Sequence, residues 1–258
     1  MLKAIIFDLD DTLIDWGEFD EEWDKVETPH IKKAHTYLSE RFADAPDLLT
    51  FKSEYLRRTS NAWAHARNTL IAPHIGRTLF ETVVALGVDK TAITREDLMK
   101  AYDWGKIPGT VVFPDVIPGL TRLQAAGLQF GLVTNAYQPM LLRDVEMEQH
   151  GLLTFFPSCR FSAADHGYLK PHPSIFEAVL TCLGIEPEDA VFIGDNPTAD
   201  VAGAQAAGMR AILRVTARRK PLLSGVIIPD AAINSFDELP AVLKGWFPGW
   251  EDQQKDDV

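Results

Sequence analysis

Two patterns of hydrophobic residues divide the chain, and the one that covers most of it predicts a parallel α/β sheet. Short apolar runs rich in β-branched residues predict strands, at residues 3–9, 128–133, 159–162, 190–193, 211–215 and 226–228. Helical spacing predicts the elements between them, at residues 116–126, 139–150, 174–184, 199–207 and 238–243. Strands joined by helices of this length need right-handed crossovers, so we expect a doubly wound α/β fold with the first strand near its centre.

The second pattern fills residues 16–109, where apolar residues recur at helical intervals. Helices are predicted from Trp23 to about Phe42, over 48–67, over 71–86 and from Thr94 onward, with Gly87 closing the third. An insertion of this length is too long for a loop and predicts a helical subdomain. We therefore expect a core of residues 1–15 and 110–250, a helical cap of residues 16–109, and a frayed acidic tail of residues 251–258.

Composition and charge exclude several classes of protein. The chain has 25 Lys and Arg against 37 Asp and Glu, a formal charge of −12, which repels nucleic-acid backbones and anionic membrane surfaces. No stretch reaches the ~18 apolar residues that a membrane span needs, and no signal peptide is visible. The two cysteines, Cys159 and Cys182, have no zinc-ligand spacing, so we expect free thiols and a cytoplasmic protein. The sequence carries no signal for an oligomeric state.

Polar side chains follow the predicted strands at the points where each strand ends. In chain order, they are Asp8, Asp10 and Thr12 after the first strand, Thr134 and Asn135 after the second, Lys170 after the third, and Asp195, Asn196 and Asp200 after the fourth. Because the carboxyl ends of parallel strands meet at one edge of a sheet, these side chains should converge on one crevice.

Such a crevice suits phosphate chemistry with a hard metal ion. Carboxylate oxygens favour Mg²⁺, which also accepts a substrate phosphate oxygen. Without a cation, a phosphate dianion ~4 Å from one carboxylate would meet roughly 8 kcal/mol of repulsion at an effective dielectric of ~20. Mg²⁺ and Lys170 together can overcome this repulsion. A carboxylate could then attack phosphorus and form an acyl phosphate, while a second carboxyl serves as acid and base.

These motifs, in this order, resemble those of the haloacid dehalogenase-like superfamily: Asp8-x-Asp10-x-Thr12, Thr134-Asn135, Lys170-Pro171, and Gly194-Asp195 with Asp200. The helical insertion is similar to the first class of cap domain in that superfamily, so the resemblance spans nearly the whole chain. It implies that Asp8 is the nucleophile and Asp10 the general acid and base. It also implies that Thr134 and the backbone amide of Asn135 hold the phosphoryl group, and that Lys170 neutralises it.

The resemblance also implies a Mg²⁺ site. The ligands would be the carboxylates of Asp8 and Asp195 and the backbone carbonyl of Asp10. Asp200 would orient Lys170 or a metal-bound water, and Thr12 and Asn196 would support the ligands from behind. The implied activity is a Mg²⁺-dependent phosphatase acting on a small phosphorylated metabolite through an aspartyl-phosphate, without nucleic-acid or membrane partners.

Three alternatives stay open. Phosphomutases of the superfamily share all four motifs. Members that resemble the 2-haloacid dehalogenases lack an acid at the position of Asp10 and need no metal, so Asp10 favours phosphate chemistry. A non-catalytic binding protein could keep the same fold. In the cap, the spacing of Trp63 favours a core position and that of Arg57, Arg58 and Arg67 a solvated face, so no specificity residue is assigned.

Overall fold

A six-stranded sheet forms the core of the computed structural model, which describes residues 1–17, 19, 22–216 and 227–252. Its strands are β1 (Ala4–Phe7), β4 (Gln129–Thr134), β5 (Arg160–Ser162), β6 (Ala190–Gly194), β7 (Arg210–Arg214) and β8 (Ala231–Ile233). They lie in the order β5-β4-β1-β6-β7-β8, and every neighbouring pair is parallel. All four residues of β1 are buried, and the strand lies inside the sheet as predicted.

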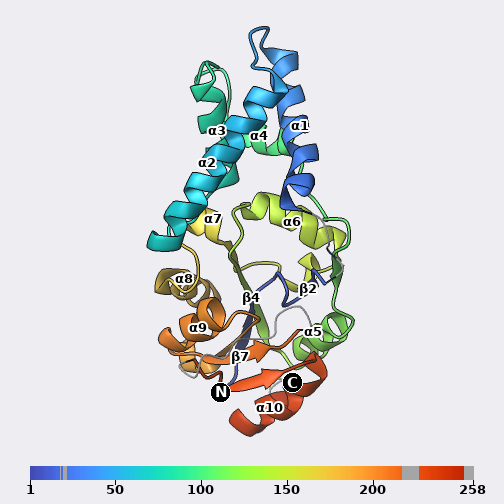
Figure 1. Cartoon of the computed structure of the whole chain (residues 1–258). Helices are drawn as coiled ribbons and strands as arrows, with labels where there is room; N and C mark the ends of the chain where they lie inside the picture. Colours follow the sequence, from blue (N-terminus) through green and yellow to red (C-terminus); the bar gives the residue numbers. More distant parts are fainter. Residues whose placement is uncertain (18, 20–21, 217–226, 253–258) are drawn as a thin grey trace.

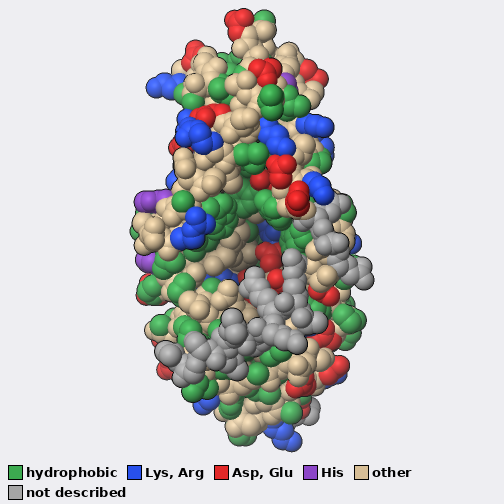
Figure 2. Space-filling model, in the orientation of Figure 1, with side chains coloured by type: hydrophobic (Ala, Val, Ile, Leu, Met, Phe, Trp, Pro, Cys, Tyr) green, Lys and Arg blue, Asp and Glu red, His purple; other side chains and the backbone are tan. Residues whose placement is uncertain are grey.

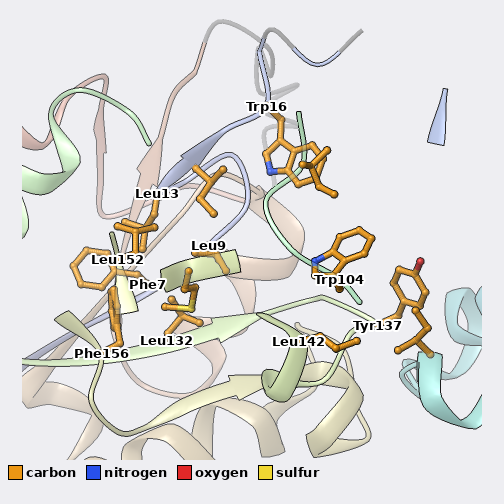
Figure 3. Close-up of a cluster of buried hydrophobic side chains, with 14 of the residues drawn as sticks. Phe7, Leu9, Leu13, Trp16, Trp104, Leu132, Tyr137, Leu142, Leu152 and Phe156 are labelled. Carbon is orange, nitrogen blue, oxygen red and sulfur yellow. The ribbon is translucent and has the colours of Figure 1, made fainter. Parts of the chain in front are cut away.

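Helices cover both faces of this sheet, which confirms the doubly wound fold. The helices on one face are α5 (Val116–Ala125), α6 (Met140–Gln149) and α10 (Leu239–Trp246), and those on the other are α8 (Pro173–Leu183) and α9 (Ala202–Ala206). Because strand side chains alternate, Ile5 and Phe7 pack in the first layer and Ile6 in the second. Figure 3 shows Phe7 among Leu132, Leu152 and Phe156 in the first layer.

Four helices between residues 16 and 110 form a separate layer, named here the helical unit: α1 (Trp23–Arg41), α2 (Leu48–Thr69), α3 (Ile75–Ala85) and α4 (Arg95–Tyr102). Figure 1 shows them gathered at one end of the molecule, with α6 between them and the sheet. A two-stranded antiparallel ribbon, β2 (Ile14–Asp15) with β3 (Val111–Val112), joins the two ends of the insertion. The ribbon lies directly outside residues 16–109, the interval that we propose as the cap.

Local signals explain the helix ends in this unit. Gly87 follows α3 with a φ of 96°, a conformation that suits glycine. The Thr94 side chain accepts a hydrogen bond from the Asp97 backbone N–H at the start of α4. The expected start of the third helix near residue 71 is wrong, because Leu70 is left-handed and Pro73 follows.

The last strand also differs from the expectation. Ile227 and Ile228 do not form a strand, and Val226 lies outside the described residues; β8 begins three residues after Ile228 instead. Pro229 has no backbone N–H to donate, and the Asp230 side chain accepts the Ala211 N–H, which fixes the register of β8 beside β7.

Two further elements differ in detail. The helix expected at 199–207 begins earlier, with a π-helical turn at Pro197–Val201 that continues into α9. Near the C-terminus, Trp250–Asp252 forms a short 3₁₀ turn. The remainder of the expected tail, 253–258, lies outside the described residues. Within the described part of the chain, no helix is both long enough and apolar enough to cross a bilayer.

The two cysteines form a disulfide, so the expectation of free thiols is wrong. Cys159 precedes β5 and Cys182 lies near the end of α8; their Cα atoms are 5.5 Å apart although 23 residues separate them in sequence. Sequence spacing could not show this pair, because the packing of α8 against β4 and β5 brings the two residues together. The cytoplasmic location inferred from free thiols loses that support.

Thiol titration checks this bond. Protein purified without reductant and unfolded in guanidinium should react with no equivalents of a thiol reagent, and with two after reduction, because both cysteines are in the disulfide. Two reactive thiols before reduction would contradict the pairing.

Candidate active site

Asp8 lies directly after β1, buried at the edge where the strands end. Its carboxylate accepts hydrogen bonds from Lys170 Nζ at 2.6 Å and from Thr12 Oγ1 at 3.1 Å. Burial raises the pKa of Asp8 to about 7, against the opposing effect of the Lys170 charge. The Asp8 carboxylate is therefore held in place by two donors, which suits a nucleophile that must meet its target in one orientation.

Lys170 lies in the loop before α8 and is only 3% exposed. Its Nζ contacts Asp8, Asp200 Oδ1 at 2.7 Å and the Val133 carbonyl at 2.9 Å. Burial alone would lower the pKa of Lys170, but the carboxylates of Asp200 and Asp8 outweigh it and raise the pKa. The side chain of Asn135 fixes the loop, since it accepts from the Lys170 N–H and donates to the Lys170 carbonyl. Lys170 is thus a permanent positive charge beside Asp8.

Three carboxylates lie close together here, and two of them, Asp8 and Asp200, contact Lys170. Oxygens of Asp8, Asp195 and Asp200 all lie within 4.8 Å of one another, and all three residues are buried. Asp200 is held by the Asn196 N–H at 2.9 Å, and any side chain at Gly194 would collide with it. Hard oxygen donors at this spacing fit Mg²⁺.

Asp10 is turned away from this carboxylate group. Its Oδ1 accepts from Arg143 at 2.7 Å and from Trp16 Nε1 at 3.1 Å, and its Oδ2 accepts from Thr134 Oγ1 at 3.3 Å. Only Leu9 separates Asp8 from Asp10 in sequence, and the left-handed Asp11 follows with a φ of 58°. The turn therefore presents the two carboxyls in different directions, one toward Lys170 and one toward the helical unit.

Arg143 is a site residue that the sequence did not reveal. It lies on α6, is 2% exposed, and pairs with Asp10 and with the buried Glu146 at 2.8 Å. Trp104, in the segment that leaves the helical unit, donates to the same Glu146 at 2.9 Å. An Arg and a Glu three positions apart on an amphipathic helix normally indicate a solvated pair, so only the packing of α6 under the helical unit identifies them.

Tyr137 connects the core to the helical unit. It follows β4 and donates to Glu27 Oε1 of α1, which also accepts from Tyr55 at 3.0 Å and from Tyr102 at 3.2 Å. Burial raises the pKa of Glu27, while the three phenol donors oppose this. No local pattern in the sequence indicates this cluster, because its four members come from four separate segments.

Two adjoining cavities surround these residues. One of about 210 Å³ is lined by eight of the nine predicted site residues, Asp8, Asp10, Thr134, Asn135, Lys170, Asp195, Asn196 and Asp200, together with Ala199. The ninth, Thr12, contacts Asp8 from behind. The other cavity, of about 390 Å³, shares Asp10 and Asn135 with the first and extends toward the helical unit. Trp63, expected in a core, is half-buried and lines this second cavity.

Comparison with known proteins places this geometry in a family. The haloacid dehalogenase-like hydrolase profile matches residues 2–208. The glyceraldehyde 3-phosphate phosphatase of Methanopyrus kandleri is 30% identical over 213 residues, 81% of this chain and 82% of that protein. A phosphoglycolate phosphatase of Salmonella typhimurium is 25% identical over 245 residues, 94% of this chain and 92% of that protein.

Solved structures agree on the fold. The 2-haloacid dehalogenase of Pseudomonas syringae pv. Tomato DC3000 has a TM-score of 0.61 and 26% identity, and the match covers 95% of this chain and all of that one. The HAD phosphatase of Thermococcus onnurineus has a TM-score of 0.55, 24% identity and 95% coverage of this chain. The chain belongs to the haloacid dehalogenase-like hydrolases.

Proposed function

We propose that this protein is a Mg²⁺-dependent phosphatase that hydrolyses a small phosphorylated metabolite through an aspartyl-phosphate on Asp8. The observation that carries the proposal is the position of Asp10, which lies at the junction of the two cavities. A carboxyl there adjoins both the phosphate compartment and the compartment left for the alcohol. The phosphatase relatives support the same reaction class.

The reaction would run in two displacements. An Asp8 oxygen attacks phosphorus, the bond from phosphorus to the ester oxygen breaks, and protonated Asp10 gives its proton to the leaving alcohol. A water molecule then attacks the phosphorus of the aspartyl-phosphate and loses its proton to Asp10. The bond from phosphorus to Asp8 breaks, inorganic phosphate leaves, and both carboxyls return to their starting states.

The other residues hold the phosphoryl group. Lys170 contributes a positive charge beside Asp8, and Thr134 with the backbone amide of Asn135 would donate to the phosphoryl oxygens. Mg²⁺ would be held by the carboxylates of Asp8 and Asp195 and by the Asp10 carbonyl, with Asp200 beside them. When bound, the ion supplies charge neutralisation for the transferring group.

Metal binding can be measured without turnover. Adding Mg²⁺ at about 100 times its Kd should stabilise the protein by about 2.7 kcal/mol, or roughly 5–10 °C in Tm, because the ion binds the folded carboxylates. Asp195→Asn should lose most of this shift, whereas Asp44→Asn, at an exposed position, should keep it. An equal shift for both variants would argue against Asp195 as a ligand.

Asp10→Asn should slow both displacements. The amide cannot donate a carboxyl proton to the alcohol or take one from water, so we expect a loss of about 10²–10⁴-fold in kcat with the fold unchanged. Steady-state phosphate release measures it. A variant that retains more than a tenth of the wild-type kcat would rule out the acid and base role.

The 2-haloacid dehalogenase structure is the basis for the second candidate function. The sequence resemblance separates the two, because dehalogenases lack an acid at the position of Asp10. The experiment is a panel of sugar phosphates, nucleoside monophosphates and organic-acid phosphates, assayed with Mg²⁺ and with chelator, beside 2-haloacids. Metal-dependent phosphate release supports the phosphatase. Halide release that persists in chelator would support the dehalogenase, and turnover only with a phosphorylated activator would support a mutase.

A further inference from the structure

The cavity beside Asp10 is lined largely by aromatic rings. Five of its lining residues are aromatic: Trp16, Phe19, Trp23, Trp63 and Tyr137. Figure 2 shows the corresponding hollow between the helical unit and the core, with hydrophobic side chains on its upper rim and acidic side chains inside it. Its volume of about 390 Å³ accommodates a ring on a short linker, which is more than a two- or three-carbon alcohol fills.

The rings form two groups from different parts of the chain. Trp16 contacts Phe19 and Trp23, with centroids 5.3 Å and 6.1 Å away. Trp63 of α2 meets Tyr137 of the core at 6.0 Å in an edge-to-face arrangement. Rings from the helical unit, from the segment that precedes α1 and from the core therefore line one cavity.

Hydrogen bonds hold two of these rings in place, and ring packing holds a third. Trp16 donates its indole N–H to Asp10, and Tyr137 donates its hydroxyl to the buried Glu27. Trp23 packs against Trp104, which donates to Glu146. Rings that are fixed before binding lose little conformational entropy when a ligand arrives, which favours affinity for a flat partner.

The charges in the lining disfavour a charged leaving group. Asp11 lines the cavity beside Asp10 and would repel a carboxylate. Arg143 also lines it and would repel a fixed cation, while its guanidinium is already paired with Asp10 and Glu146. Charges of both signs at the base of an aromatic cavity favour an uncharged group.

We infer that the preferred substrates are phosphate monoesters of uncharged alcohols that carry an aromatic ring. This inference rests on the proposed phosphatase function and narrows it. The phosphate would occupy the cavity of Asp8 and Lys170, and the ring would lie between Trp16 and Trp63. The acidic leaving group of phosphoglycolate, the substrate named for one relative, would be a poor fit.

Matched esters test this inference. 2-Phenylethyl phosphate and ethyl phosphate are both esters of primary alcohols, so their leaving groups are of similar acidity and differ mainly in the ring. We expect kcat/KM for 2-phenylethyl phosphate to be at least about tenfold higher, since one well-packed ring contributes on this scale. Phosphoglycolate and phosphocholine serve as the anionic and cationic comparisons, and both should be poorer than 2-phenylethyl phosphate.

Two tryptophans in different parts of the fold provide a test variant and a matched control. Trp63→Leu should lower the ratio of the two kcat/KM values at least about fivefold, because it removes one wall of the cavity. Trp246→Leu should leave the ratio unchanged, because Trp246 lies on α10 and packs against Arg210 at 5.0 Å, away from both cavities. Equal effects of the two variants would overturn the role of Trp63.

A binding measurement separates the inference from the proposed function. Calorimetry should show tighter binding of benzylphosphonate than of methylphosphonate, whether or not either cavity supports turnover. If ethyl phosphate, phosphoglycolate or phosphocholine is hydrolysed as well as 2-phenylethyl phosphate, the inference fails and the phosphatase stands. If no ester releases phosphate with Mg²⁺, the proposed function fails; tighter binding of benzylphosphonate than of methylphosphonate would still support the aromatic preference of the cavity, and equal binding of the two would overturn it.

Discussion

Asp8→Asn should abolish phosphate release, with a loss of at least about 10³-fold in kcat, because the amide is a much poorer nucleophile than the carboxylate that it replaces. The change conserves volume, and Asp8 is a buried carboxyl whose pKa burial raises to about 7, so the free energy of unfolding should not fall greatly. Phosphate release and thermal unfolding, measured on the same preparation, check both parts.

The exposed Asp44, in the loop between α1 and α2, gives the matched control for this substitution. Asp44→Asn should retain wild-type activity, because the same chemical change is made far from the site. If Asp8→Asn were folded and kept more than a tenth of wild-type activity, Asp8 could not be the nucleophile.

Lys170→Met should damage both stability and activity. The substitution keeps a long unbranched side chain but removes the cation that pairs with Asp8 at 2.6 Å and with Asp200 at 2.7 Å. Breaking a buried pair leaves uncompensated charge, so we expect a loss of about 3–5 kcal/mol in the free energy of unfolding. Activity should fall by at least about 10²-fold, because the charge beside the phosphoryl group is lost.

Lys3 offers a matched comparison, because it pairs with Asp189 at 2.5 Å with its side chain 49% exposed. Lys3→Met should cost far less stability than Lys170→Met, because an exposed ion pair contributes little to the free energy of unfolding. Urea unfolding of both variants gives the difference, and adding Asp200→Asn to Lys170→Met should recover part of the lost stability. Similar losses for the two lysine variants would contradict the description of Lys170 as a buried counter-charge.

The sequence was sufficient for the core and for the residues around Asp8. Apolar runs marked five of the six sheet strands, and the ends of parallel strands must share one edge of a sheet, so polar residues after those strands had to converge. The structure brings eight of the nine around one cavity for this reason. Asp10 and Thr134, 124 residues apart in sequence, are within 3.3 Å.

The remainder depended on contacts that no local pattern encodes. Arg143 and Glu146 have the spacing of a surface pair, and only the position of α6 beneath the helical unit buries them. The Cys159–Cys182 bond and the Glu27 cluster join segments whose distance in space is set by packing. The last strand is a similar case: residues 231–233 pair with β7, although the apolar run that precedes Pro229 predicted the strand at residues 226–228.

The measurement that tests the central claim most directly is the trapping of the phosphorylated protein. Enzyme turning over a hydrolysable ester with Mg²⁺ would be quenched in acid, where an acyl phosphate persists long enough for peptide mass spectrometry. We predict one phosphoryl group on the peptide that contains Asp8 and none on that peptide in Asp8→Asn, because the Asp8 carboxylate is the group that receives the phosphoryl group. Active enzyme that releases phosphate yet never carries a phosphoryl group on Asp8 would contradict the account.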